Sequence, residues 1–174
     1  MRKPLGDSPF YLNMIGVMDD GMRKNYITNN ICIGDKDSSY MNFDVVVNMN
    51  YPYNRIPHGK IGRREESVHK NNCTLYLVGL CDHDSENIND YIDIIIPKLQ
   101  KRYEENNDTK FLFHCFAGKS RSVAITLAFM IKVMRISFDD ALSLIKEERP
   151  IIIPRPLFIE NIRDKNYDSL SGNI

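Results

Sequence analysis

One short stretch of this chain carries the residue types and the spacing that phosphate chemistry needs. It reads His114-Cys115-Phe116-Ala117-Gly118-Lys119-Ser120-Arg121-Ser122. Cys115 follows the apolar run 111–113 and precedes the apolar segment 123–134, so we expect a strand, a tight loop and a helix in that order. This arrangement aims backbone N–H groups at an anion. The stretch therefore predicts a thiolate that attacks a phosphate ester.

The side chains of the stretch have separate roles in this chemistry. A helix N-terminus beside Arg121 and Lys119 lowers a thiol pKa from about 8.5 to roughly 3.5–7.5, so Cys115 would be a thiolate able to attack phosphorus. Arg121 would bind two phosphate oxygens with its planar guanidinium, which a lysine cannot do. Ser122 would donate a hydrogen bond to the sulfur when it leaves phosphorus, and His114 would orient the loop by hydrogen bonding.

The backbone of the same loop would hold the phosphate group. Gly118 lets the main chain approach the anion closely. Charge stabilisation and positioning supply most of the catalysis in phosphoryl transfer, and this loop offers both without a metal or another cofactor. The N–H groups expected to bind the non-bridging oxygens belong to Phe116, Ala117, Gly118, Lys119, Ser120 and Arg121.

Composition and charge limit the class of protein. A chain of 174 residues is long enough for one domain, and 43% apolar with 26% charged residues is ordinary for a globular protein. The formal net charge is zero, so nothing global favours binding to nucleic acid or to an anionic membrane. No apolar run is long enough for a signal peptide or a membrane span. We expect a cytoplasmic or nuclear protein that is not secreted.

The four cysteines are too widely spaced for a CxxC pair, which argues against a zinc site. Without a secretion signal, reduced thiols are expected. Cys32 lies in an apolar run and is interpreted as a small core residue, and Cys73 and Cys81 are interpreted as packing residues. Cys115 alone is assigned a chemical role.

Strands alternate with helices along the chain, which predicts an α/β fold with a mostly parallel central sheet flanked by helices on both faces. The expected strands are 31–33, 43–49, 74–80 and 111–113. The expected helices are 88–103 with a kink at Pro97, 123–134, 138–148 and 157–164. Residues 51–72 are interpreted as a polar, irregular segment. Residues 1–26 are interpreted as an N-terminal extension with a short helix, and residues 27–174 as the catalytic domain.

The stretch around Cys115 resembles the signature of the dual-specificity protein phosphatases, a family of cysteine-dependent phosphatases. That signature is His-Cys, five residues, then Arg and Ser or Thr, and residues 114–122 meet it in full. Residues 27–34 and 148–152 are similar to the family's opening strand and its closing helix and turn. The resemblance implies a metal-independent phosphatase that forms a cysteinyl-phosphate intermediate. It also implies phosphorylated protein substrates and a shallow pocket, open to phosphotyrosine, phosphoserine and phosphothreonine.

The resemblance also implies an aspartic acid on a loop some thirty residues before the cysteine. Residues 80–88 match that loop, and Asp82 aligns best with the acid. Asp82 would protonate the leaving oxygen and then activate the hydrolytic water. Asp84 is the rival, although a helix-capping role suits it better. The chain departs from the family at Arg155, where members often carry Asn, so the resemblance does not carry over a loop-supporting hydrogen bond at this position.

Other substrates remain open for such a loop. A phosphoinositide is compatible with Lys119, but the residue after Cys115 is Phe and not a base. Relatives of the same fold hydrolyse RNA 5′-triphosphates, although their loop usually differs around Gly118 and after the arginine. A phosphate-binding protein without activity is disfavoured because Cys115, Arg121 and Asp82 are all present.

Two further segments have alternative interpretations. Residues 55–70 are rich in Arg, Lys and His, which favours a solvated loop or, alternatively, a docking surface for an acidic, phosphorylated partner. The abundance of Asn, Ile and Lys and the layout ahead of the domain resemble poxvirus-type members, some of which dimerise through an N-terminal helix. This resemblance implies a homodimer formed through residues 1–26.

Overall fold

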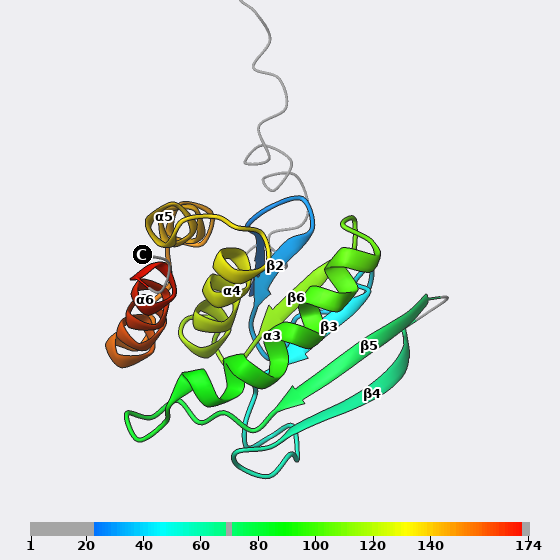
Figure 1. The fold of residues 1–174 in the computed structure, drawn as a ribbon. Helices are drawn as coiled ribbons and strands as arrows, with labels where there is room; N and C mark the ends of the chain where they lie inside the picture. The colour runs from blue at the N-terminus through cyan, green and yellow to red at the C-terminus, as the bar shows by residue number, and fades with distance from the viewer. Residues whose placement is uncertain (1–22, 69–70, 172–174) are drawn as a thin grey trace, which may run out of the picture.

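The computed structural model of the chain describes residues 23–68 and 71–171, in which helices pack against a central sheet (Figure 1). In this part of the chain the sheet has six strands, in the order β1-β2-β6-β3-β5-β4. They are β1 (Lys24–Tyr26), β2 (Ile31–Gly34), β3 (Val45–Asn48), β4 (Ile61–Val68), β5 (Asn71–Val78) and β6 (Phe111–His114). The inner four strands run parallel, and β1 and β4 are antiparallel edge strands. The predicted α/β class with a mostly parallel sheet is confirmed.

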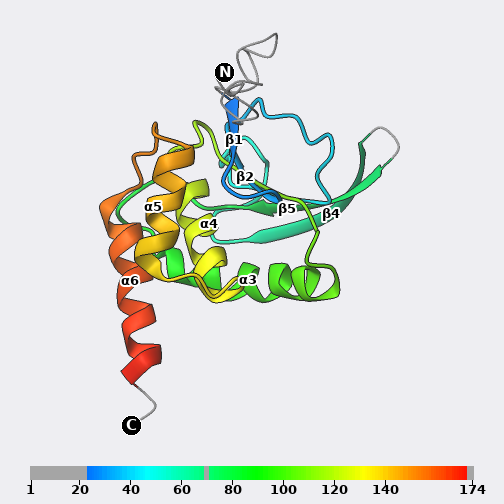
Figure 2. The same ribbon diagram turned by 90° about the horizontal axis from the view of Figure 1, so that it is seen from above.

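The helices of the described residues are α3 (Ile88–Glu105), α4 (Arg121–Lys132), α5 (Phe138–Glu148) and α6 (Pro156–Ser171). α4 packs on β6 and β2 and contacts α3, α5 and α6. We expected helices on both faces of the sheet, but within the described ranges all four lie on the same side (Figure 2). Loop residues Tyr40, Phe43 and Ile56 pack on the opposite face. None of these helices is both long and apolar enough to cross a membrane.

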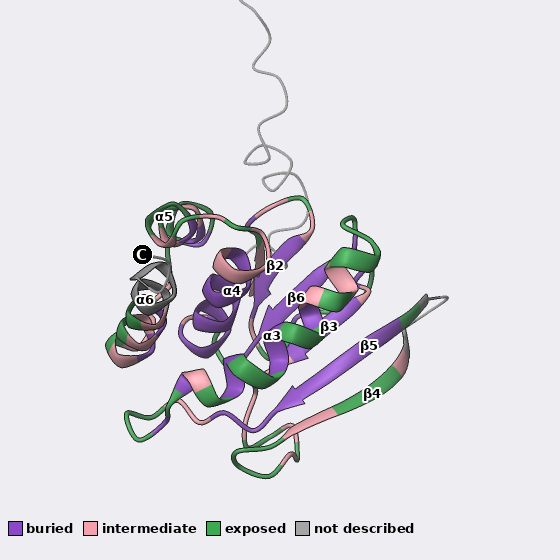
Figure 3. Cartoon of the chain, in the orientation of Figure 1, coloured by how far each residue is buried: buried purple, intermediate pink, exposed green. Residues whose placement is uncertain are grey.

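Successive strand residues point to opposite faces of the sheet, so each inner strand contributes to two apolar layers. The layer under the helices includes Ile31, Ile33, Val45, Val47, Phe111 and Phe113. The layer on the other face includes Cys32, Val46, Cys73, Leu75, Leu77 and Leu112. Every residue of β6 is buried, as Figure 3 shows along the middle of the sheet. The strand that leads into Cys115 is therefore held from both sides, and Cys32 and Cys73 are the packing residues that the sequence predicted.

The prediction that residues 51–72 are irregular throughout was wrong. β4 forms a hairpin with β5 inside this segment and lies at the edge of the sheet. Arg63 lies 2.5 Å from Glu65, and Arg64 lies 3.4 Å from Glu66. Charged residues on an edge strand discourage pairing with another chain. In β4 they also replace the alternation of apolar and polar residues from which a strand is predicted. The paired charges fit the favoured interpretation, a solvated surface.

The two ends of the domain also differ from the prediction. Residues 24–26, which were assigned to the extension, pair with β2 as strand β1. α6 begins one residue earlier than expected and continues past residue 164 to Ser171. α3 runs through Pro97 to Glu105. The short helix expected within residues 1–26, and the homodimer assigned to it, lie largely outside the described residues.

Truncation of Phe129 tests the core that supports the site. The ring of Phe129 on α4 lies 4.9 Å from that of Phe111 and 5.6 Å from that of Phe113, both on β6. Phe129→Ala should lower the free energy of unfolding by about 3–5 kcal/mol, measured by urea denaturation. Ile94→Ala on α3 is the control, because Ile94 is 48% exposed and its loss should cost less than about 0.5 kcal/mol. Equal losses in the two variants would contradict this packing.

Candidate active site

The predicted strand, loop and helix meet at the centre of the sheet. β6 lies between β2 and β3 and ends at His114, and α4 begins at Arg121. The loop between them contains Cys115, which is only 2% exposed. Because parallel strands end at one edge of the sheet, segments after β2 and β3 reach the same place. The backbone N–H of Lys36 donates to Phe116 O at 3.1 Å, and that of Met49 donates to His114 O at 2.8 Å.

The backbone carbonyl groups of loop residues 116–120 each accept a hydrogen bond from outside the loop. The donor to Phe116 O is the Lys36 N–H, and the next two carbonyls face a buried arginine, Arg149. Arg149 Nε donates to Gly118 O at 2.7 Å, and Nη2 lies 3.5 Å from Ala117 O. The remaining bonds are Ile153 N to Lys119 O at 3.0 Å and Ala124 N to Ser120 O at 3.0 Å. In a trans peptide the N–H points opposite to the C=O, so outward carbonyls imply inward N–H groups.

Gly118 is required by the shape of this loop. Its φ is +63°, a conformation that L side chains rarely adopt. A Cβ at this position would lie 2.5 Å from Gly34 O and 2.6 Å from Arg149 Nη2. Arg149 is fully buried, and burial lowers its pKa, although the nearby carboxylate of Asp35 opposes this effect. A loop with any other residue at position 118 would lose either this turn or the arginine behind it.

Arg121 is anchored at one corner of its guanidinium. Nη1 donates to Met49 O at 2.8 Å and lies 3.2 Å from Tyr51 O and 3.3 Å from Leu80 O. Nε is buried and has no hydrogen-bond partner among the described residues. Its nearest carboxylate oxygen is Asp82 Oδ2, at 3.9 Å. Because Nη1 is held by backbone carbonyls, the Nε and Nη2 edge of the guanidinium is left to bind two oxygens of an anion. The bidentate role predicted for Arg121 requires such an edge.

The environment of Cys115 favours a thiolate. Burial raises the pKa of the thiol, but hydrogen bonds from the Ser122 hydroxyl and backbone, the charge of Arg121 and the Gly118 backbone outweigh it, so the net pKa is lowered from the ordinary value. The Cys115 Sγ lies 3.3 Å from Ser122 Oγ. Cys73 is the contrast, because burial raises its pKa to about 11. Hydrogen bonds and charge, and not burial, thus distinguish the predicted nucleophile.

His114 lies beneath the loop and is almost fully buried. Its Nε2 is 2.8 Å from the hydroxyl of Tyr40, which also accepts a hydrogen bond from Asn48 Nδ2 at 3.1 Å. Burial lowers the pKa of His114 to about 4, so the ring is neutral at neutral pH. A neutral, hydrogen-bonded ring suits the orienting role that the sequence predicts, and Tyr40 is a partner that the sequence did not indicate.

Asp82 lies beside the loop and is bound by two side chains. Its Oδ1 accepts hydrogen bonds from Ser120 Oγ and from Arg155 Nε, each at 3.0 Å. Arg155 also binds Asp84, with Nη1 2.8 Å from Asp84 Oδ1. Asp84 is 71% exposed at its side chain, against 33% for Asp82. The sequence left the hydrogen bond from position 155 in question, and in the structure Arg155 binds both aspartates.

The structure brings Cys115, Ser122, Arg121, Ser120 and Asp82 into one connected group. Phe116 and Ala117 are exposed on the outer side of the loop, while Gly118 is buried and Lys119 is half-buried. Sequence reasoning missed Arg149 and Arg155. Both are arginines in the turn after α5, and their sequence positions alone do not show which carbonyls and carboxylates they reach.

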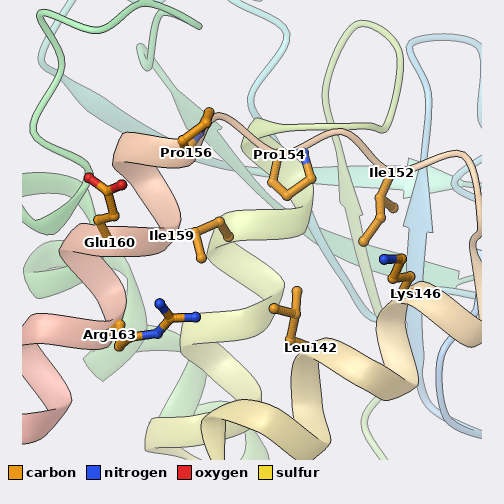
Figure 4. A pocket seen from close by; sticks show the side chains of 8 residues that line it. All are labelled: Leu142, Lys146, Ile152, Pro154, Pro156, Ile159, Glu160 and Arg163. Carbon is orange, nitrogen blue, oxygen red and sulfur yellow. The ribbon is translucent and has the colours of Figure 1, made fainter.

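A separate cavity of about 310 Å³ lies between α5, α6 and the segment before α6 (Figure 4). It is lined by Leu142, Lys146, Ile152, Pro154, Pro156, Ile159, Glu160 and Arg163. None of the predicted site residues is among them, so this cavity is not the phosphate site. No cluster of three or more His, Cys, Asp or Glu residues that could hold a metal occurs in the described part of the chain.

Comparison with known proteins places the chain in a family. Residues 25–168 match the family model described as dual specificity phosphatase, catalytic domain. The chain therefore belongs to the dual specificity phosphatase family, as its signature around Cys115 predicted.

Individual relatives match parts of the chain. A probable dual specificity protein phosphatase of Dictyostelium discoideum is 36% identical over 86 residues, which are 49% of this chain and 21% of the relative. Dual specificity protein phosphatase 1 of Arabidopsis thaliana is 29% identical over 97 residues, 56% of this chain and 48% of the relative. The matches thus span less than half the length of these relatives. The crystal structure of human DUSP28 shares the fold, with a TM-score of 0.67 at 14% identity over 84% of this chain and 98% of that one.

Removal of the Ser122 hydroxyl tests the electrostatics of the nucleophile. A hydrogen bond to a charged group contributes roughly 1.5–3 kcal/mol, and about 1.4 kcal/mol corresponds to one pKa unit. The Ser122 hydroxyl stabilises the charged form of Cys115, so Ser122→Ala should raise the pKa of Cys115 and move its alkylation midpoint by about one to two pH units. The rate of alkylation by iodoacetamide, followed at Cys115 by peptide mass spectrometry, should reach its midpoint at correspondingly higher pH.

The control for this measurement is Ser137→Ala. Ser137 caps α5 and accepts a hydrogen bond from Asp140 N at 3.2 Å, so its loss should leave the midpoint of Cys115 alkylation unchanged. An unchanged midpoint in Ser122→Ala would show that this hydroxyl does not stabilise the thiolate.

Proposed function

We propose that this protein hydrolyses phosphate esters on protein side chains, with Cys115 as nucleophile and without a metal. The observation that carries the proposal is the position of Cys115 Sγ, 3.3 Å from Ser122 Oγ and near Arg121, in a loop whose carbonyls from 116 to 120 are bound from outside. Membership of the dual specificity phosphatase family supports it. A nucleophilic thiolate must stay reduced, and the four described cysteines are unpaired, so the proposal includes a reducing compartment such as cytoplasm or nucleus.

In the first step the Cys115 Sγ attacks phosphorus in line with the leaving oxygen. The S–P bond forms as the P–O bond to the substrate breaks, and Asp82 donates its proton to that oxygen. The inward N–H groups of the loop and the unanchored edge of Arg121 bind the non-bridging oxygens. They stabilise the charge that develops there, and they need no rearrangement to do so.

In the second step water attacks the cysteinyl phosphate. The water proton passes to the Asp82 carboxylate, the P–S bond breaks and inorganic phosphate is released. The electron pair returns to sulfur, where the hydrogen bond from Ser122 Oγ stabilises the departing thiolate. Asp82 is then protonated again, so the cycle closes with no other reactant.

The residues beside the loop favour a protein substrate over a polyanionic one. Phe116 and Tyr53 are 46% and 68% exposed, and their rings lie 5.9 Å apart. Lys36 lies 5.9 Å from the Phe116 ring and is paired with Asp37. Aromatic surface suits the side chain and flanking residues of a peptide. A phosphoinositide or an RNA triphosphate would need additional positive charge here.

Four substrates compared side by side test this function. A doubly phosphorylated peptide and an aryl phosphate should be hydrolysed faster than a phosphoinositide and a triphosphorylated RNA. Cys115→Ser should abolish turnover of all four while it retains phosphopeptide binding, because a serine hydroxyl is not ionised in this environment. Faster turnover of the phosphoinositide or the RNA would contradict the proposed protein substrate. Undiminished turnover by Cys115→Ser would exclude Cys115 as the nucleophile.

The roles of the two loop aspartates can be separated by matched amides. Asp82→Asn removes the proposed proton donor and should reduce turnover of a phosphotyrosine peptide by about 10²–10⁴-fold. Asp84→Asn changes an exposed carboxylate and should reduce it less than about threefold. Steady-state kinetics of the two variants would decide the assignment, and a large loss in Asp84→Asn with a small one in Asp82→Asn would exchange the two roles.

A further inference from the structure

We propose that Arg155 is a positioning residue for Asp82, which it orients so that Oδ2 is the oxygen that exchanges the proton. This inference rests on the proposed function of Asp82 as general acid. It assigns a role in this chain to a position where an arginine replaces the Asn that family members often carry.

The contacts of Arg155 concentrate on the loop that carries Asp82. Nε donates to Asp82 Oδ1 at 3.0 Å, and Nη2 donates to the backbone carbonyl of Asp82 at 2.6 Å. Nη1 donates to Asp84 Oδ1 at 2.8 Å. The Arg155 guanidinium therefore fixes both the side chain and the main chain of Asp82. It also fixes the carboxylate of Asp84. Asn, with one short amide, cannot make three such contacts.

The two oxygens of Asp82 have different surroundings. Oδ1 accepts from both Arg155 Nε and Ser120 Oγ, so its lone pairs are occupied by two donors. Oδ2 has no hydrogen bond among the described residues and faces Arg121 Nε at 3.9 Å. Arg121 is the residue whose free edge would hold the phosphate. Oδ2 is thus the oxygen on the side of the bound substrate.

The same arginine also connects the loop that carries Asp82 (the acid loop) to the loop between β6 and α4 that carries Cys115 (the phosphate loop). Its backbone N–H donates to Ser120 Oγ at 3.2 Å, and Ser120 Oγ in turn donates to Asp82 Oδ1. Two residues earlier, the N–H of Ile153 donates to Lys119 O at 3.0 Å. Pro154 and Pro156 flank Arg155 and restrict its backbone, so little conformational freedom is lost when these bonds form. Arg155 therefore transmits the position of the phosphate loop to the acid.

The proton transfers follow from this arrangement. In the first step the O–H bond at Asp82 Oδ2 breaks, the proton passes to the leaving oxygen, and Oδ1 stays hydrogen-bonded to Arg155 and Ser120. In the second step Oδ2 accepts the proton from water. Hydrogen bonds with Asp84 and Asp82 raise the pKa of Arg155, so it remains a cation and exchanges no proton in either step.

The dependence of turnover on the leaving group tests this role. A phosphotyrosine peptide releases a phenol of pKa about 10 and needs the acid, whereas a fluorinated umbelliferyl phosphate releases a stable anion and does not. Arg155→Met should lower kcat for the peptide by about 10–100-fold and kcat for the umbelliferyl ester by less than about threefold. Arg155→Lys should recover part of the loss, because an ammonium can bind one carboxylate oxygen.

A double-mutant comparison separates positioning from general structural damage. If Arg155 acts only through Asp82, Asp82→Asn with Arg155→Met should be no slower on the peptide than Asp82→Asn alone. Arg102→Met is the matched control, because Arg102 lies on α3 and pairs with Glu105 at 3.6 Å. It should leave both substrates unaffected. Arg155→Asn provides a second variant should Arg155→Met fail to fold, and it should show the same selective loss.

The outcomes are distinguishable. Equal losses on both substrates, no loss on either, or additive losses in the double mutant would overturn the role of Arg155 while Asp82→Asn still shows its selective loss. If Asp82→Asn shows no dependence on the leaving group, the acid assignment and this inference both fall. A wild-type protein that hydrolyses neither ester would refute the proposed function itself, and the inference with it.

Discussion

A buried thiol whose pKa is lowered from the ordinary value is the constraint on which the rest of this structure depends. Cys115 is almost inaccessible to water, and burial alone would keep its thiol neutral. The charge is favourable only because donors converge on it: the hydroxyl and backbone of Ser122, the Gly118 backbone and the guanidinium of Arg121. Convergence requires that the loop turn its N–H groups inward, and therefore that its carbonyls find donors elsewhere. The surrounding fold supplies those donors.

Three arginines contribute to the site in different ways. Arg149 is fully buried and binds the outward carbonyls, so its role is to hold the shape of the loop. Arg121 is anchored at Nη1 by backbone carbonyls, which leaves its other edge for an anion. Arg155 binds carboxylates and connects the acid loop with the phosphate loop. A guanidinium can serve all three purposes because its donors are planar, numerous and permanently charged.

The loop that carries Asp82 is also held at its far end. Glu86 is buried, contacts the His58 ring through Oε1 and accepts a hydrogen bond from the Tyr91 hydroxyl at 2.8 Å. Burial and the neighbouring Glu86 raise the pKa of Tyr91, so its hydroxyl remains a donor. Arg155 on one side and Glu86 on the other fix the acid loop between the phosphate loop and α3. This double attachment suits a proton donor that must meet the leaving oxygen in one orientation.

The sequence by itself determined the nucleophile loop, the α/β class and the family, because strand, loop, signature and helix are contiguous and their contacts are local. It also indicated Asp82 through its distance from Cys115. It could not reveal β4, whose charged residues conceal the strand pattern, nor the partners of Arg149 and Arg155, which lie 31 to 124 residues away in the chain. Only tertiary structure decides which carbonyl or carboxylate a long, flexible arginine reaches, since many partners are equally compatible with its position in the sequence. The sequence therefore indicated the candidate reacting groups, and the folded chain determined what holds them in place.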